Sequence, residues 1–119
     1  MGRDYRKLKV FESVDDLAVR VYLVTGKFPR EEMYGLATQM RRAAVSVPAN
    51  IVEGSSRSSE SEYLHFLDIA KGSLEELGYY IHLSHRLGLL DENENQGLQQ
   101  DFSTCIKQLQ ALVNALRKR

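Results

Sequence analysis

The sequence predicts an all-α fold, an up-and-down antiparallel bundle of four helices. Apolar residues recur at spacings of three and four in four long segments, and no segment shows the alternation that is typical of strands. Short connections containing glycine, proline or serine separate these segments. The length of 119 residues, with 43% hydrophobic and 27% charged residues, fits a single domain over residues 1–119.

The first helix is expected from about Ser13 to about Gly26. Ser13 is a suitable N-cap, because its side chain can accept a hydrogen bond from a free backbone amide. Gly26 can adopt the left-handed conformation that ends helices, and Pro29 prevents continuation, so residues 26–30 are predicted to form a connection. The predicted buried stripe of this helix consists of Val14, Leu17, Val21 and Val24.

The second helix is expected to follow this connection and to end at Gly54. Pro48 lies inside it, lacks an amide hydrogen and crowds the carbonyl of Ala44, at a cost of roughly 3 kcal/mol if uncompensated. We therefore expect a kink near Ala44. The predicted buried stripe consists of Met33, Ala37, Met40, Ala44, Val47 and Ile51.

The third and fourth helices both begin with a capping-box spacing, Ser59 with Glu62 and Asp91 with Glu94. The third is expected to end before Gly88. Its predicted stripe is Tyr63, Leu67, Ala70, Leu74, Leu77, Ile81 and Ser84. The stripe of the fourth is Phe102, Ile106, Leu109, Val113 and Leu116, flanked by Leu98, Cys105 and Leu112.

The second half of the second helix, residues 41–54, is apolar on nearly every side. Such a helix must be buried all round, and a chain of this length builds only one modest core. Exposed apolar side chains are also common on monomers, which is the simpler interpretation. We nevertheless predict self-association through the apolar residues outside the predicted stripes, which are Val19, Leu23, Val45, Pro48 and Val52.

Charge and composition give no sign of a membrane or nucleic-acid protein. The 16 basic and 16 acidic residues give a formal net charge of zero, so no global field draws the chain to nucleic acid or to an anionic membrane. No apolar run approaches membrane-spanning length, and the single Cys105 cannot form an intrachain disulfide. A cytoplasmic location is expected, with no membrane partner.

No catalytic, metal or cofactor site is expected. Glu62 with His65 has the Glu-x-x-His spacing of di-iron bundles, but such bundles need this motif on two helices and carboxylates on two others. His82 and His85 lie one turn apart on a polar stripe, and Cys105 has the surroundings of a small buried hydrophobe. Three polar residues are expected to fix register or cap backbone groups instead: Asn50, Glu53 and Glu75.

Four segments carry a family resemblance: residues 34–36, 41–54, 66–77 and 85–88. Together they closely resemble the bacterial four-helix-bundle proteins called 23S rRNA intervening-sequence proteins. The resemblance implies a cytosolic homopentamer of four-helix bundles around a central axis, with no established enzymatic activity. Some relatives are encoded within intervening sequences of large-subunit ribosomal RNA. An accessory protein of diversity-generating retroelements, which partners a reverse transcriptase, resembles the same fold.

These associations imply two possible roles. One is a scaffold that contacts RNA or an RNA-handling partner. Its best local contacts are Arg41, Arg42 and Arg57, which a five-fold ring would repeat. The alternative for Arg41 and Arg42 is an ion pair, since Glu53 lies on the same helix stripe as Arg42, and Arg57 is otherwise a solvated loop residue. The other role is an oligomeric interaction module with no nucleic-acid contact. The retroelement relatives are typically basic, whereas this chain is neutral, and this difference favours the second role.

Overall fold

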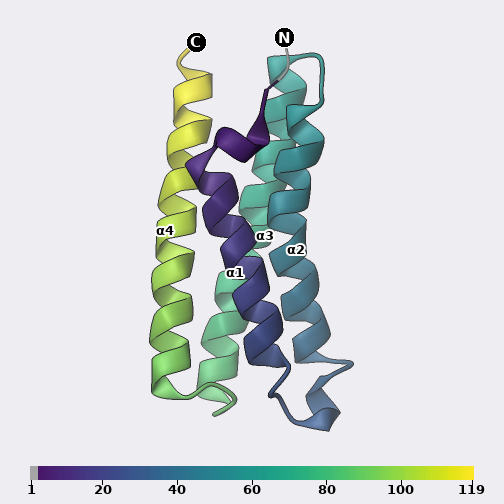
Figure 1. Ribbon diagram of the computed structural model, residues 1–119, viewed down its shortest axis with the longest axis vertical. Helices are drawn as coiled ribbons and strands as arrows, with labels where there is room; N and C mark the ends of the chain where they lie inside the picture. Colours follow the sequence, from purple (N-terminus) through teal and green to yellow (C-terminus); the bar gives the residue numbers. More distant parts are fainter. Residues whose placement is uncertain (1–2) are drawn as a thin grey trace.

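Four long helices build the protein in the computed structural model, which describes residues 3–119 (Figure 1). They are α1 (Lys9–Thr25), α2 (Leu36–Ser55), α3 (Glu60–Arg86) and α4 (Glu92–Arg117). Two short 3-10 helices, η1 (Tyr5–Lys7) and η2 (Arg30–Glu32), precede α1 and α2. No strand occurs between residues 3 and 119, so the all-α prediction is confirmed.

The helices form a ring in which each one packs against two neighbours. α1 contacts α2, α2 contacts α3, α3 contacts α4, and α4 closes the ring against α1. Both ends of the chain and the α2–α3 loop lie at one end of the bundle, and the α1–α2 and α3–α4 connections lie at the other (Figure 1). This is the predicted up-and-down arrangement, extending 46 × 24 × 19 Å.

The predicted stripes form most of the core. All residues expected to be buried on α1 and α3 are buried. On α2, Met33 differs, because it lies before the helix begins and is half-buried. The inward face of α4 is rotated from the predicted one, since Leu98 and Cys105 are fully buried whereas Phe102 and Ile106 are half-buried.

α1 ends at Thr25 with Gly26 as its C-cap, as predicted, but its predicted start and the conformation expected of Gly26 are wrong. α1 begins at Lys9 rather than near Ser13, because Val10 is buried and Phe11 packs edge-on against Tyr5 at 4.8 Å between ring centroids. These contacts stabilise a helical turn that lacks a side-chain cap. Gly26 has right-handed backbone angles (φ −61°, ψ −19°) rather than the left-handed ones expected of it.

The boundaries of α2 also differ from the expected ones. The connection before it extends beyond residue 30 through η2 to Gly35, because buried Phe28 anchors the chain before the helix starts. At its other end the helix runs through Gly54 to Ser55. It is assigned as one helix across Pro48, and the kink expected near Ala44 stays a prediction.

The caps of the last two helices follow the sequence signals. The Ser59 hydroxyl accepts a hydrogen bond from the Glu62 amide at 3.1 Å. Asp91 and Glu94 form a full capping box, in which each side chain accepts a hydrogen bond from the other residue's amide. After α3, Gly88 has a positive φ of 75°, which favours glycine.

Three glycines bring neighbouring helices close together. An added Cβ at Gly54 of α2 would lie 2.8 Å from Phe66 Cβ of α3, and one at Gly78 of α3 would lie 2.6 Å from Phe102 Cε1 of α4. At Gly97 of α4, the added atom would lie 2.7 Å from a guanidinium nitrogen of Arg20 of α1. We call these three contacts glycine notches, because each glycine leaves room for a side chain of the next helix.

Candidate assembly and nucleic-acid surfaces

Apolar side chains are exposed on the two adjacent helices α1 and α2. Val19 and Leu23 of α1 are 55% and 68% exposed, and Val45 of α2 is 43% exposed. Tyr22 of α1, which the sequence reasoning did not single out, is 46% exposed. We call Val19, Tyr22, Leu23 and Val45 the α1–α2 face. Exposed apolar residues on adjacent elements are typical of surfaces that contact other proteins.

The other two candidate interface residues, Pro48 and Val52, are only half-buried and contribute less free surface. Val52 borders a hollow whose opposite wall is the N-terminal segment, residues 3–6. The protein's own chain therefore covers part of the surface that the apolar pattern of α2 suggested for a partner. In the sequence, only the apolar residues before Ser13 indicated that the N-terminal segment would pack against the bundle.

Arg41 holds α2 to α1. Its Nε donates a hydrogen bond to the Thr25 hydroxyl at 2.8 Å, and its Nη2 donates to the Tyr22 carbonyl at 3.2 Å. The guanidinium also lies 4.7 Å from the centroid of the Tyr22 ring. These contacts hold the guanidinium against α1.

Arg57 is also engaged within the chain rather than being a solvated loop residue. It forms an ion pair with Glu53, four residues earlier, and its guanidinium lies 4.7 Å from the centroid of the Phe66 ring. Glu53 therefore pairs with Arg57 and not with Arg42. The spacing of four residues places the two side chains on one side of the helix end, which explains the choice.

Arg42 differs from both, because it is exposed and makes no side-chain hydrogen bond or ion pair within residues 3–119. It borders a polar hollow of about 210 Å³ between α2 and α3. The other lining residues are Gln39, Ala43, Ser46, Ser73 and Glu76. Of the three candidate arginines, Arg42 has the most accessible guanidinium for an anionic partner.

The candidate structural polar residues have different surroundings. The Asn50 side-chain amide donates hydrogen bonds to the Ser46 carbonyl at 2.8 Å and to its hydroxyl at 3.0 Å. The Ser46 hydroxyl lies 2.8 Å from that of Ser73 on α3, so this short chain of bonds joins the two helices. Glu75 is exposed and forms no side-chain hydrogen bond or ion pair in the part of the chain that the structure describes.

Several basic residues belong to the segments that meet at the end of the bundle holding the α2–α3 loop, a meeting that Figure 1 shows for the backbone. They come from three segments: Arg3, Arg6 and Lys7; Arg57; and Arg117, Lys118 and Arg119. Ion pairs to Asp4, Glu53, Asp68 and Glu60 engage Arg6, Arg57, Arg117 and Arg119. Arg3, Lys7 and Lys118 make no ion pair within residues 3–119. We call this surface the basic end.

The chemical groups that catalysis would need are sparse. Among residues 3–119, no group of three or more His, Cys, Asp and Glu side chains could hold a metal ion. Burial, together with the charges of Asp101 and Asp16, raises the pKa of the Cys105 thiol to about 12, so a thiolate is disfavoured. No helix in this part of the chain is long and apolar enough to cross a membrane.

Comparison with known proteins gives one family and one fold. The model of the family described as 23S rRNA-intervening sequence protein matches residues 6–111. A crystal structure from Bacteroides thetaiotaomicron, described as a protein with unknown function from the S23 ribosomal protein family, superposes with a TM-score of 0.80. The two chains are 22% identical, and the match covers 88% of this chain and 95% of the other. No curated protein matches the sequence.

Proposed function

Because the chain belongs to the 23S rRNA-intervening sequence protein family, we propose that it is a non-enzymatic scaffold that assembles with itself and contacts RNA or an RNA-handling partner. Five subunits are what the family resemblance implies. The observation that carries the proposal is the exposed α1–α2 face, which a soluble protein would bury by self-association. A kink at Pro48 would shape the side of α2 that takes part.

The α1–α2 face has the character of a subunit interface. Its side chains are aliphatic or aromatic, the types that bury apolar area at the centre of such contacts. Arg41 lies beside it, and its hydrogen bonds to Thr25 and to the Tyr22 carbonyl replace part of its hydration. Assembly in a ring would place copies of each subunit's charged surfaces side by side.

The basic end supports the contact with RNA. Acidic residues also lie at this end, where Asp4, Glu53, Glu60 and Asp68 pair with four of the seven cations. Three cations there make no ion pair within residues 3–119, and Arg42 adds an accessible guanidinium on the α2–α3 side. In a ring these groups would be repeated by every subunit, and phosphate binding depends on such multiplicity.

A specific observation favours the alternative role, an interaction module without a nucleic-acid contact. Two of the three candidate arginines, Arg41 and Arg57, are engaged by other groups of the chain. Four of the seven cations at the basic end are likewise ion-paired. If the remaining cations are too few, the assembled ring would present protein surfaces alone to its partners.

The self-association part is tested by measuring mass in solution with multi-angle light scattering. We expect a mass close to five times the 13.6 kDa of one chain. Leu23→Asp should shift the mass toward a single chain, because a buried carboxylate lacks a partner at an apolar interface. Leu87→Asp is the matched control, since Leu87 is similarly exposed but lies after α3, outside the α1–α2 face. A wild-type mass of one chain would contradict the proposal.

The RNA part is tested by binding to structured ribosomal RNA at about 0.05 M and 0.2 M salt, because phosphate contacts produce a log-linear loss of affinity with salt. Arg42→Gln and Lys118→Gln should weaken binding and reduce the salt dependence. Arg30→Gln, at the other end of the bundle, should change neither. Absence of binding at the lower salt concentration, with assembly intact, would favour the alternative role.

A further inference from the structure

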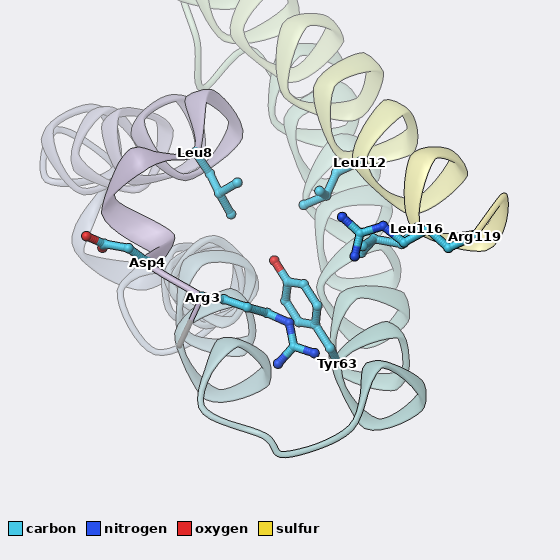
Figure 2. A pocket seen from close by; sticks show the side chains of 7 residues that line it. All are labelled: Arg3, Asp4, Leu8, Tyr63, Leu112, Leu116 and Arg119. Carbon is cyan, nitrogen blue, oxygen red and sulfur yellow. The ribbon is translucent and has the colours of Figure 1, made fainter. Parts of the chain in front are cut away.

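A small pocket opens at the basic end, between segments that are far apart in the sequence. Its volume is about 230 Å³, and most of its lining is apolar. Its walls come from the N-terminal segment before α1, the first turn of α3 and the last turns of α4 (Figure 2). An engineered cavity of about 150 Å³ accommodates benzene, so the apolar part of this pocket is large enough for one aromatic ring.

The hydroxyl of Tyr63 supplies a polar group inside the pocket. The residue is only 3% exposed, and its hydroxyl forms no hydrogen bond within residues 3–119. Figure 2 shows this hydroxyl pointing into the space between Leu8 and Leu112. Solvent reaches the hydroxyl through the pocket, so it is free to donate to a ligand. Burial raises the pKa of Tyr63, an effect that Arg3 partly offsets, so the group is a donor at neutral pH.

Two guanidinium groups stand at the rim, and each is held in place through a single nitrogen. The Nη1 of Arg3 donates to the Arg57 carbonyl at 2.8 Å, and the Arg3 guanidinium lies 4.4 Å from the centroid of the Tyr63 ring. The Nη1 of Arg119 forms an ion pair with Glu60 at 2.7 Å. A guanidinium has five N–H donors, so each arginine retains donors for a further acceptor.

Asp4 does not compete for these donors, whereas Glu60 already accepts from one nitrogen of Arg119. Asp4 is turned away from the pocket (Figure 2) and accepts hydrogen bonds from the Arg6 side chain and amide, both at 3.1 Å. The Arg6 guanidinium lowers the pKa of Asp4, so Asp4 is ionised and already paired. The inner surface of the pocket therefore combines leucine walls with donors and positive charge.

We propose that this pocket binds a small aromatic monocarboxylate, with the ring against the leucine walls and the carboxylate beside the Tyr63 hydroxyl and the Arg119 guanidinium. The apolar walls need a ring to displace water from them. The Tyr63 hydroxyl and the remaining N–H donors of Arg119 match the two oxygens of one carboxylate. A bare phosphate would leave water in contact with the leucine side chains, and a neutral aromatic compound would leave the hydrogen-bond donors without an acceptor. This site does not depend on the proposed function.

The test uses 3-phenylpropionate as the probe, with isothermal titration calorimetry and methyl NMR spectra of the leucines. We expect saturable binding, with chemical-shift changes concentrated on the three leucines of the pocket. The neutral analogue 3-phenylpropanol should bind at least about tenfold more weakly, because it lacks the charge that the donors recognise. Equal binding of the acid and the alcohol, or shift changes spread over the surface, would overturn the proposal.

Variants separate the pocket from general attraction to a basic surface. Arg119→Gln should weaken binding of 3-phenylpropionate about tenfold, and Tyr63→Phe should weaken it several-fold while preserving the ring and the fold. Arg117→Gln is the matched control, because it removes the same charge from the same helix end at a residue that pairs with Asp68 outside the pocket. An equal loss in Arg117→Gln and Arg119→Gln would overturn the proposal.

Discussion

The inner and outer faces of α3 carry similar side chains in opposite surroundings. The inner face, from Tyr63 to Ser84, is buried along the whole helix. The outer face includes Ile69 and Tyr79, which are 39% and 56% exposed, and Gly72, which has no neighbouring atom within 4 Å of an added Cβ. Isoleucine and tyrosine thus occur on both sides of one helix.

The difference teaches that position within the helical period decides burial, and apolar character alone does not. Residues at the repeated spacing of three and four meet the other helices, whereas apolar residues outside it are left to solvent or to a partner. The same distinction separates the core stripe of α1 from Val19 and Leu23 on the α1–α2 face. Paired substitutions on the two faces measure how much burial contributes to the stability of the folded protein.

The largest expected difference is between Ile81→Ala and Ile69→Ala. Ile81 is fully buried, so its truncation should lower the free energy of unfolding by about 3 kcal/mol through lost burial and an unfilled cavity. Ile69→Ala should cost less than about 1 kcal/mol, because water already reaches the side chain and alanine favours the helix. Urea denaturation followed by circular dichroism measures both. Equal losses would show that another surface covers Ile69 in solution.

A comparable difference, made up of two smaller single effects, is expected between Gly78→Ala and Gly72→Ala. The new methyl group at Gly78 would collide with the Phe102 ring, and such overpacking should cost about 2 kcal/mol. At Gly72 the methyl group meets open space, so alanine should stabilise the protein by about 0.5 to 1 kcal/mol. Thermal unfolding should move in opposite directions. A stabilised Gly78→Ala variant would mean that Phe102 moves aside at no cost.

The smallest expected effect is the pH dependence that Cys105 adds on the inner face of α4. Burial raises its thiol pKa from 9.0 to about 12, so on raising the pH the unfolded chain loses this proton before the folded one. The contribution to stability is therefore complete below pH 9 and is lost progressively up to about pH 12.

Between about pH 8 and pH 10, the free energy of unfolding of the wild type should fall by roughly 1 kcal/mol more than that of Cys105→Ala. Urea denaturation at the two pH values measures the difference. The variant provides its own control, because lysine and tyrosine titrations affect both proteins alike. Parallel pH dependences would show that the thiol is in contact with water in the folded state.

The helical period was enough to predict the fold and most of the core, because burial follows directly from spacing. Helix ends were harder to predict. The early start of α1 depends on the packing of Tyr5 against Phe11. The right-handed conformation of Gly26 depends on the burial of Phe28 two residues later. Such contacts override local capping preferences, which are worth only about 1 kcal/mol.

The candidate surfaces were only partly predictable. The exposure of Val19, Leu23 and Val45 follows from their positions outside the stripes. The contact of Arg41 with Thr25 joins two helices and has no local signature, whereas the spacing of Glu53 and Arg57 could have indicated their ion pair. The basic end required the antiparallel order of the helices, since only that order brings residues 3–7, 57 and 117–119 together.

The glycine notches have a mechanical consequence for the bundle. A helix that slid along its neighbour by one turn would move about 5.4 Å, which would force Phe66, Phe102 or Arg20 out of its notch and against a side chain. The three notches join α2 to α3, α3 to α4 and α4 to α1, and the Arg41 hydrogen bond joins α1 to α2. The two phenylalanine notches therefore oppose axial sliding of α3 against α2 and α4, whereas the flexible end of Arg20 could move aside and leave α1 freer to shift.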